Sequence, residues 1–163
     1  MSTVAVTGFI EAHAVDVWRL LIDLPGRAAR LSAAGPVELL TPGPFGPGTA
    51  WREERAQPGG GTLTEEFLVV EACAPHRLVL CTSGAGVDYR ITWTLRSVRR
   101  RRRGCTAVTV TQEAVPTAPY GRVVALLLGA LAARAVEVAL RRDLADLTFA
   151  ANAAGATGAV EAA

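Results

Sequence analysis

The amino-acid sequence predicts a single α+β domain in which one antiparallel β-sheet packs against a long C-terminal helix. The chain has 163 residues and 50% of them are hydrophobic, which suffices for one self-contained core. Residues 37–116 contain short alternating segments separated by turn residues, as in an antiparallel meander. Residues 119–150 form the longest apolar segment and have the spacing of a helix.

The N-terminal segment predicts one strand and two helices. Residues 4–10 form a short stretch rich in β-branched residues, which is typical of a strand. Apolar residues between positions 14 and 24 then recur with helical spacing, and Pro25-Gly26 ends this helix. A second, short helix is expected at residues 27–32, before Gly35-Pro36 breaks it.

Further strands are expected in the middle of the chain, mostly separated by segments that contain Gly or Pro. Their expected ranges are 37–41, 49–56, 62–73, 77–83, 87–98 and 105–115. In residues 87–98 the apolar side chains alternate with polar ones, which predicts one dry and one solvated face. The dry face comprises Val87, Tyr89, Ile91, Trp93 and Leu95.

The C-terminal helix is expected over residues 119–150. One stripe of it would face the sheet and consists of Leu126, Gly129, Ala133, Val136, Leu140, Leu144 and Leu147. The first half is apolar on nearly all sides, so it either covers the mouth of a cavity or forms a homodimer interface. Residues 151–163 are rich in Ala and Gly and are expected to form a flexible tail, which leaves one domain at residues 1–150.

The composition excludes several kinds of chemistry. All 17 of the lysine and arginine positions are arginine, which rules out a lysine Schiff base, a pyridoxal-phosphate anchor and a Walker A loop. The three cysteines have neither disulfide nor metal-site spacing and are expected to be reduced. We expect no cofactor, no metal and no integral membrane segment. Because a signal peptide is not visible, we expect a cytoplasmic location, and the Ala- and Arg-rich composition is typical of a GC-rich bacterial genome.

The positive charge is concentrated in one run, Arg99–Arg103. The chain has a net charge of +2, so the remaining residues together carry −3. Such a run can contact phosphates of nucleic acid or anionic lipid. However, it lacks interleaved aromatic residues and lies between two alternating segments, which favours a solvated hairpin tip. We therefore expect no nucleic-acid partner.

Three residues with inward parity are candidates for binding a ligand. Tyr89 and Trp93 share the dry face of their strand, so they either pack in the core or present their rings to a flat ligand. Gln112 follows Val108 and Val110 at every second position of the strand, so the three side chains point to the same face. This places an amide where apolar residues are expected. A buried amide needs partners, so Gln112 binds either a ligand or a neighbouring backbone group.

Three other residues are candidates for catalysis. Glu53 and Glu65 lie on adjacent expected strands, each in phase with an aromatic residue. If that face is inward, the two carboxylates can exchange protons with an enolisable ketone. The alternative, which the pattern favours, is that they point outward and pair with Arg52 or Arg55. His76 follows a Pro at a turn and is expected at the surface more readily than in a catalytic site.

The element order and five short motifs resemble the SRPBCC superfamily, which includes START-like and pollen-allergen-like proteins with a helix-grip fold. The motifs are Gly-Thr-Ala-Trp-Arg-Glu-Glu-Arg at 48–55, Thr-Glu-Glu at 64–66, Ala-Pro-His-Arg-Leu at 74–78, Thr-Trp-Thr-Leu at 92–95 and Gly-Cys-Thr at 104–106. The chain is most similar to the bacterial polyketide cyclase/dehydrase branch. It departs from the pattern at the arginine run and at Cys105, where a second glycine is common.

This resemblance implies that about seven strands wrap around the C-terminal helix and enclose a deep cavity for a hydrophobic or aromatic small molecule. The residues expected to line that cavity are Trp51, Phe67, Tyr89, Ile91, Trp93, Gln112, Leu126 and Ala133. Members of the group bind lipids and hormones or act as cyclases, so a fold of this kind does not fix one function.

Two classes of function therefore follow from the sequence. The first is a small-molecule binder, with or without cofactor-independent cyclase or dehydratase activity. The second is a protein-interaction module, similar to co-chaperone or toxin–antitoxin relatives, which uses the sheet or the apolar helix face.

Overall fold

A computed structural model describes residues 2–57, 60–84, 86–100, 103–117 and 119–161 of the chain. Side chains are described in these ranges except at residues 103, 119–131 and 155–161. The elements are β1 (Ser2–Ile10), α1 (Ala14–Ile22), α2 (Arg27–Arg30), β2 (Ala34–Leu39), β3 (Ala50–Ala56), β4 (Thr62–Cys73), β5 (Arg77–Gly84), β6 (Val87–Arg100), β7 (Arg103–Pro116) and α3 (Pro119–Glu161).

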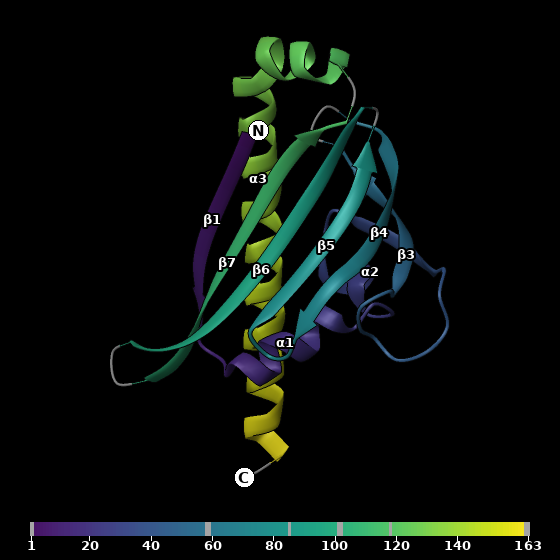
Figure 1. Cartoon of the computed structure of the whole chain (residues 1–163). Helices are drawn as coiled ribbons and strands as arrows, with labels where there is room; N and C mark the ends of the chain where they lie inside the picture. The colour runs from purple at the N-terminus through teal and green to yellow at the C-terminus, as the bar shows by residue number, and fades with distance from the viewer. Residues whose placement is uncertain (1, 58–59, 85, 101–102, 118, 162–163) are drawn as a thin grey trace.

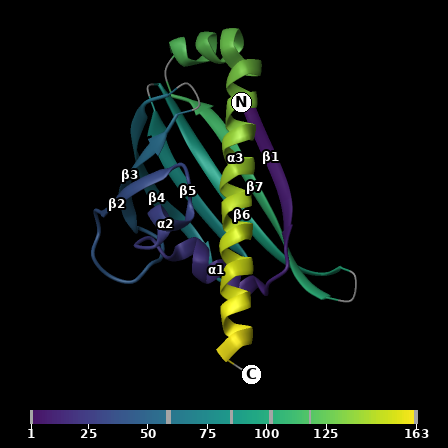
Figure 2. The same ribbon diagram turned by 180° about the vertical axis from the view of Figure 1, so that it is seen from behind.

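The described strands form one 7-stranded sheet in the order β1-β7-β6-β5-β4-β3-β2. Every neighbouring pair is antiparallel, so β2 to β7 form the meander that the turn residues predict, and β1 pairs with the last strand. The sheet curves, and α3 runs along its concave face beside β1 and β7 (Figures 1 and 2). This is the helix-grip arrangement expected from the resemblance.

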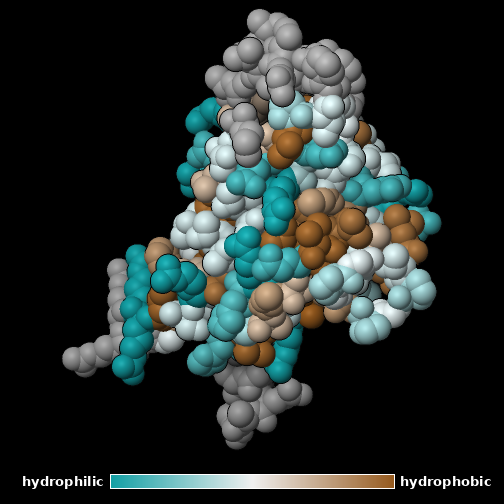
Figure 3. All heavy atoms as spheres, viewed as in Figure 1, coloured by the Kyte–Doolittle hydropathy of each residue, from teal (hydrophilic) through white to brown (hydrophobic). Residues whose placement is uncertain are grey.

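The core lies between the concave face, α1 and the second half of α3. Inward residues of β6 and β7 such as Trp93, Leu95 and Val110 are buried, as the alternation predicts. Leu140, Leu144 and Leu147 of α3 face them and are also buried, which confirms this part of the expected helix stripe. The space-filling view in Figure 3 shows the opposite, convex side of the sheet, where apolar and polar side chains are mixed.

Two helices, α2 and α3, differ from their expected lengths. α2 ends at Arg30, because the backbone is already extended at Leu31. α3 continues to Glu161, so the helix is longer than the expected range of 119–150. Alanine has the highest intrinsic helix propensity, and Ala151 is buried against the core, so the Ala-rich end extends the helix.

The arginine run lies where the hairpin between β6 and β7 reverses direction, as expected. Arg100 and Arg103 are paired across the two strands, while Arg101 and Arg102 lie outside the described residues. Figure 1 shows this hairpin extending away from the body of the molecule. Arg100 stacks over the ring of Phe9 on β1, with 4.7 Å between the guanidinium carbon and the ring centroid.

In the part of the chain that the structure describes, no helix combines the length and the apolar character needed to cross a membrane.

β1 approaches α3 closely at Gly8. A Cβ atom at this position would lie 2.7 Å from Cδ2 and 3.1 Å from Cγ of Leu144, which is itself buried. The absence of a side chain on Gly8 therefore lets the strand and the helix pack directly against each other.

We expect Gly8→Val to lower the free energy of unfolding by about 1–3 kcal/mol, because its side chain overpacks the contact with Leu144. Ala5→Val, on the exposed face of the same strand, is the control, because it adds a β-branched side chain without touching the helix. Urea unfolding of both variants measures the effect. Equal stability of the two variants would show that β1 and α3 are not in close contact.

Candidate functional site

The strand register decides which way the two glutamates face. Glu53 on β3 lies directly opposite Glu65 on β4. The pair Trp51 and Phe67 lies two residues further along the same strands, so both pairs share one face of the sheet. Trp51, Glu53 and Phe67 are all buried on the concave side. The expectation that both glutamates point outward is therefore wrong, because the outward residues of these strands are Arg52 and Glu66, which pair with each other on the surface.

Glu53 is the centre of a buried network of charges. Its Oε2 accepts a hydrogen bond from Arg27 Nε at 2.6 Å and another from Trp51 Nε1 at 3.1 Å. Its Oε1 accepts a hydrogen bond from Arg55 Nη1 at 3.0 Å. Burial alone would raise the pKa of Glu53, but Arg27 and Arg55 hold this pKa below its usual value.

Arg55 connects Glu53 to α3. Its Nη2 donates to both carboxylate oxygens of Asp143, at 3.0 and 2.8 Å. Burial would lower the pKa of Arg55, yet the carboxylates of Asp143 and Glu53 raise it, so the guanidinium stays charged. The two arginines and the two buried carboxylates thus neutralise one another.

Glu65 is placed differently from Glu53. Its side chain is 28% exposed, and its Oε2 lies 3.6 Å from Arg55 Nε, which is an ion pair but longer than a hydrogen bond. Burial raises the pKa of Glu65, and the nearby carboxylates of Glu53 and Asp143 add to this, while Arg55 opposes it. Glu65 is therefore the carboxyl of this group that combines access from outside with a raised pKa.

Sequence reasoning missed Arg27 and Asp143 as members of this site, and it named Arg55 only as a partner of glutamates on the outer face. Two signals were present in the pattern. Arg55 lies at every second position with Trp51 and Glu53, on the same face of β3. Asp143 lies at helical spacing from Leu140 and Leu147, on the buried stripe of α3. A charged residue at a core-facing position needs a partner, so each indicated a buried ion pair.

The aromatic residues expected to line a cavity fall into two groups. Trp51 and Phe67 are fully buried and stack on each other, with ring centroids 5.2 Å apart, so they belong to the core. Tyr89, Ile91 and Gln112 face the concave side and are only half-buried. No hydrogen bond of the Gln112 amide is seen within the described part of the chain.

The remaining expected residues are Trp93, Ala133, Leu126 and His76. Trp93 is buried and Ala133 is half-buried on α3. The side chain of Leu126 lies outside the described residues. His76 is exposed in the turn between β4 and β5, and its backbone bonds join Cys73 and Leu95 rather than the charge network.

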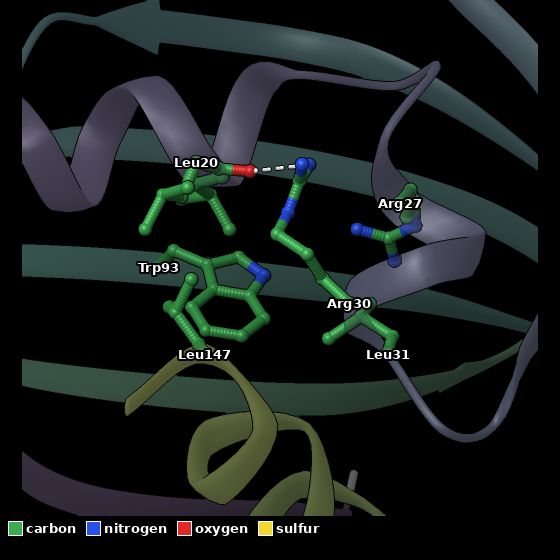
Figure 4. Close-up of a pocket in the computed structure, with 7 residues that line it drawn as sticks. Leu20, Arg27, Arg30, Leu31, Trp93 and Leu147 are labelled. Atoms are coloured by element: carbon green, nitrogen blue, oxygen red, sulfur yellow. Dashed lines mark hydrogen bonds between the residues drawn. The ribbon is translucent and has the colours of Figure 1, made fainter. Parts of the chain in front are cut away.

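A small cavity lies where α1, α2, β6 and α3 meet. Its volume is about 10 Å³, and it is lined by Leu20, Leu21, Arg27, Arg30, Leu31, Trp93 and Leu147 (Figure 4). This is the size of one water molecule, smaller than the ring-sized cavity that the resemblance implies. An open groove of about 250 Å³ lies elsewhere, at the sheet edge formed by β2, β3 and β4, beside Val37 and Glu53.

The described side chains do not form a group of three or more His, Cys, Asp or Glu residues that could hold a metal ion. The three cysteines are free thiols, as expected, with Cys105 buried and Cys73 exposed.

Comparisons with known proteins agree with this architecture. A family model described as "Polyketide cyclase / dehydrase and lipid transport" matches residues 1–151. No curated protein sequence matches the chain.

Solved structures share the fold at low sequence identity. The protein TTHA0849 from Thermus thermophilus superposes with a TM-score of 0.72 at 20% identity, covering 93% of this chain and 98% of that one. The Zhui aromatase/cyclase from Streptomyces sp. R1128 gives a TM-score of 0.71 at 19% identity, covering 92% and 93%. The di-domain aromatase/cyclase BexL of the BE-7585A biosynthetic pathway gives 0.65 at 21% identity, covering 91% of this chain but 50% of BexL.

We expect Glu65→Gln to raise the free energy of unfolding near pH 7, because burial disfavours the ionised form of Glu65 and glutamine carries no charge. A carboxyl whose pKa is raised in the folded state stabilises the fold below its unfolded pKa, and this contribution is lost as the pH rises through the folded pKa. The difference in free energy of unfolding between Glu65→Gln and the wild type should therefore be largest at neutral pH and should decrease toward pH 4.

Urea unfolding at several pH values measures this difference. Glu66→Gln is the control, because Glu66 is an exposed neighbour on the opposite face whose partner is Arg52. A Glu65→Gln variant that is less stable than the wild type at pH 7 would contradict the environment described for Glu65.

Proposed function

The chain belongs to the polyketide cyclase/dehydrase and lipid transport family, and from this premise we propose that it binds a hydrophobic or aromatic small molecule against the concave face of its sheet. We further propose that it acts in the cytoplasm and promotes cyclisation or dehydration of a ketide without a cofactor. The observation that carries the proposal is the inward, partly exposed carboxyl of Glu65, which is held beside Arg55 and has a raised pKa.

The half-buried part of the concave face is where the rings of a ligand would lie. The small cavity admits only one small group, so it cannot hold a ring system. Tyr89 and Ile91 continue the buried row of Trp93 along β6 and offer apolar surface, and the polar amide of Gln112 lies opposite Ile91 on β7. Such a surface, apolar with few polar groups, suits an oxygenated aromatic molecule.

Glu65 can carry the proton in an aldol reaction. As a carboxylate it would remove a proton next to a ketone, and the resulting enolate would attack a second carbonyl group and form the new carbon–carbon bond. The protonated Glu65 would then return the proton to the alkoxide oxygen that this attack creates, which gives a hydroxyl group. For dehydration, the carboxylate would remove a second proton from the carbon beside the ketone and pass it to that hydroxyl group, which leaves as water while the carbon–carbon double bond forms. A raised pKa suits both steps, because it brings the group closer to neutral pH.

Glu53 is unsuited to this role. Its two oxygens already accept hydrogen bonds from Arg27, Arg55 and Trp51, and its side chain is 0% exposed. We propose that Glu53 positions Arg55, which in turn lies beside Glu65.

A protein-interaction role is the second candidate. It is favoured by exposed apolar side chains on two surfaces: Leu68 and Val70 on β4, and Val138 and Phe149 on α3, where Phe149 is 78% exposed. A homodimer through α3 would cover the second surface. If Phe149→Ser lowers the association constant of the homodimer and leaves the binding of small molecules unchanged, this role would be favoured.

Ligand binding is tested with 1,8-dihydroxyanthraquinone, a flat oxygenated probe, by native mass spectrometry and tryptophan fluorescence. We expect a one-to-one complex and about tenfold weaker binding by Tyr89→Ala, since the ring contributes stacking and apolar area. Thr92→Ala, on the other face of the same strand, should bind as the wild type does. The absence of a complex, or equal losses in both variants, would contradict the proposal.

Proton transfer by Glu65 is tested with a short aryl triketone that can close to a phenolic ring. We expect Glu65→Gln to slow the release of water by about 10²–10⁴-fold, the usual contribution of general acid–base catalysis. Glu66→Gln should leave the rate unchanged. If the wild type does not accelerate cyclisation over buffer, the protein is a binder and not an enzyme for this class of substrate.

A further inference from the structure

The side chains that line the cavity beneath α2 include hydrogen-bond donors but no acceptor. Of the residues that line it, Leu20, Leu21, Leu31 and Leu147 have apolar side chains, and the others are Arg27, Arg30 and Trp93. Tryptophan and arginine side chains can only donate hydrogen bonds. Whatever occupies the cavity therefore meets donors on its polar side.

Trp93 is the central donor. The residue is only 4% exposed, and among the described residues its indole N–H has no hydrogen-bond partner. Since no fully enclosed side-chain nitrogen lacks a partner there, this N–H is open to the cavity that Trp93 lines. Figure 4 shows the indole nitrogen turned toward the side of the cavity where Arg27 and Arg30 lie. A tryptophan N–H in the interior usually has a partner, so an acceptor that enters this cavity would meet a free donor.

Arg27 provides a second donor. Its Nε and Nη2 are directed to Glu53, at 2.6 and 3.4 Å, which leaves Nη1 without a partner in the described part of the chain. Figure 4 shows a terminal nitrogen of Arg27 pointing toward the cavity. By contrast, Arg30 directs Nη1 to the Asp23 carboxylate and Nη2 to the backbone oxygens of Leu20 and Asp23.

Charge and size restrict the occupant. Arg27 is neutralised by Glu53 and Arg30 by Asp23, so the cavity has no excess charge that would require a full anion. A volume of about 10 Å³ accommodates one oxygen atom or one water molecule, and not a phosphate or a carboxylate. The occupant is thus a single neutral or partly negative oxygen.

From these observations we propose that Trp93 Nε1 and Arg27 Nη1 form a binding site for one carbonyl oxygen of the ligand. The proposal rests on the proposed function, because the ring that bears the oxygen would lie on the adjoining surface of Ile91 and Tyr89. In this arrangement Trp93 recognises the ligand through its N–H as well as through its ring. Fixed donors at this position would also stabilise the negative charge that develops on a ketone oxygen during enolisation.

The experiment compares 1-tetralone with tetralin, two probes with the same ring system that differ in the carbonyl oxygen. Binding of each to the full-length protein is measured by calorimetry, and the indole N–H signals are followed by ¹H–¹⁵N NMR. We expect the wild type to bind 1-tetralone about three- to tenfold more tightly, the contribution of one hydrogen bond. The Trp93 signal should shift downfield with 1-tetralone and not with tetralin.

Trp93→Phe keeps an aromatic ring but removes the N–H. We expect it to lose the preference for 1-tetralone while its binding of tetralin stays within about twofold. Trp18→Phe is the matched control, because Trp18 is a buried indole of α1 that does not line the cavity. The NMR shift in the wild type decides the question even if Trp93→Phe does not fold.

Three outcomes would overturn the inference. Equal binding of both probes by the wild type would leave ring binding intact and assign the cavity to a lone water molecule. A preference for 1-tetralone that survives in Trp93→Phe would place the oxygen elsewhere. Binding of neither probe, together with no complex with the anthraquinone, would refute the proposed function as well as the oxygen site.

Discussion

The structure depends on the pairing of Glu53 with Arg27 and Arg55 in its interior. A charge removed from water is strongly unfavourable unless it is paired and hydrogen-bonded, so each member of this group fixes the position of the next. Glu53 belongs to β3, Arg27 to α2 and Asp143, the other partner of Arg55, to α3. One set of ionic contacts therefore holds the short helix, the sheet edge and the long helix in register. Apolar packing alone tolerates small shifts, whereas these hydrogen bonds do not.

The same pairing distinguishes two glutamates that the sequence makes look equivalent. Glu53 has both oxygens occupied by hydrogen bonds, and Arg27 and Arg55 lower its pKa, so it keeps its negative charge to lower pH than a free carboxyl does. Glu65 lies directly opposite, where the arginines are already neutralised, and burial raises its pKa. The proposed proton carrier and its counter-charge thus lie on adjacent strands and differ because the available positive charge is closer to Glu53 than to Glu65.

Arg27 joins the two parts of the proposed site. Two of its nitrogens donate to Glu53, and the same guanidinium lines the cavity together with Trp93. The ion pair therefore orients a donor toward the position proposed for the ligand oxygen, and Arg55 extends from the same carboxylate toward Glu65. Binding and proton transfer would then depend on one buried group, which is a physical reason for placing charges in the core at all.

The sequence by itself determined the elements of the fold and the orientation of most side chains. Alternation along β6 and helical spacing along α3 report burial directly, because each pattern is local, and Trp93, Leu95, Leu140 and Leu144 are buried as those patterns predict. Only the tertiary structure decided which charged residues meet. Arg27, Arg55 and Asp143 come from three distant segments, and the outward orientation favoured for Glu53 and Glu65 was wrong because it depended on the register of β3 and β4. The end of α3 was also misjudged, since the packing of Ala151 is a long-range contact. A local pattern can indicate that a charged residue is buried, but pairing across a core has no period along the chain, so the pattern does not identify the partner.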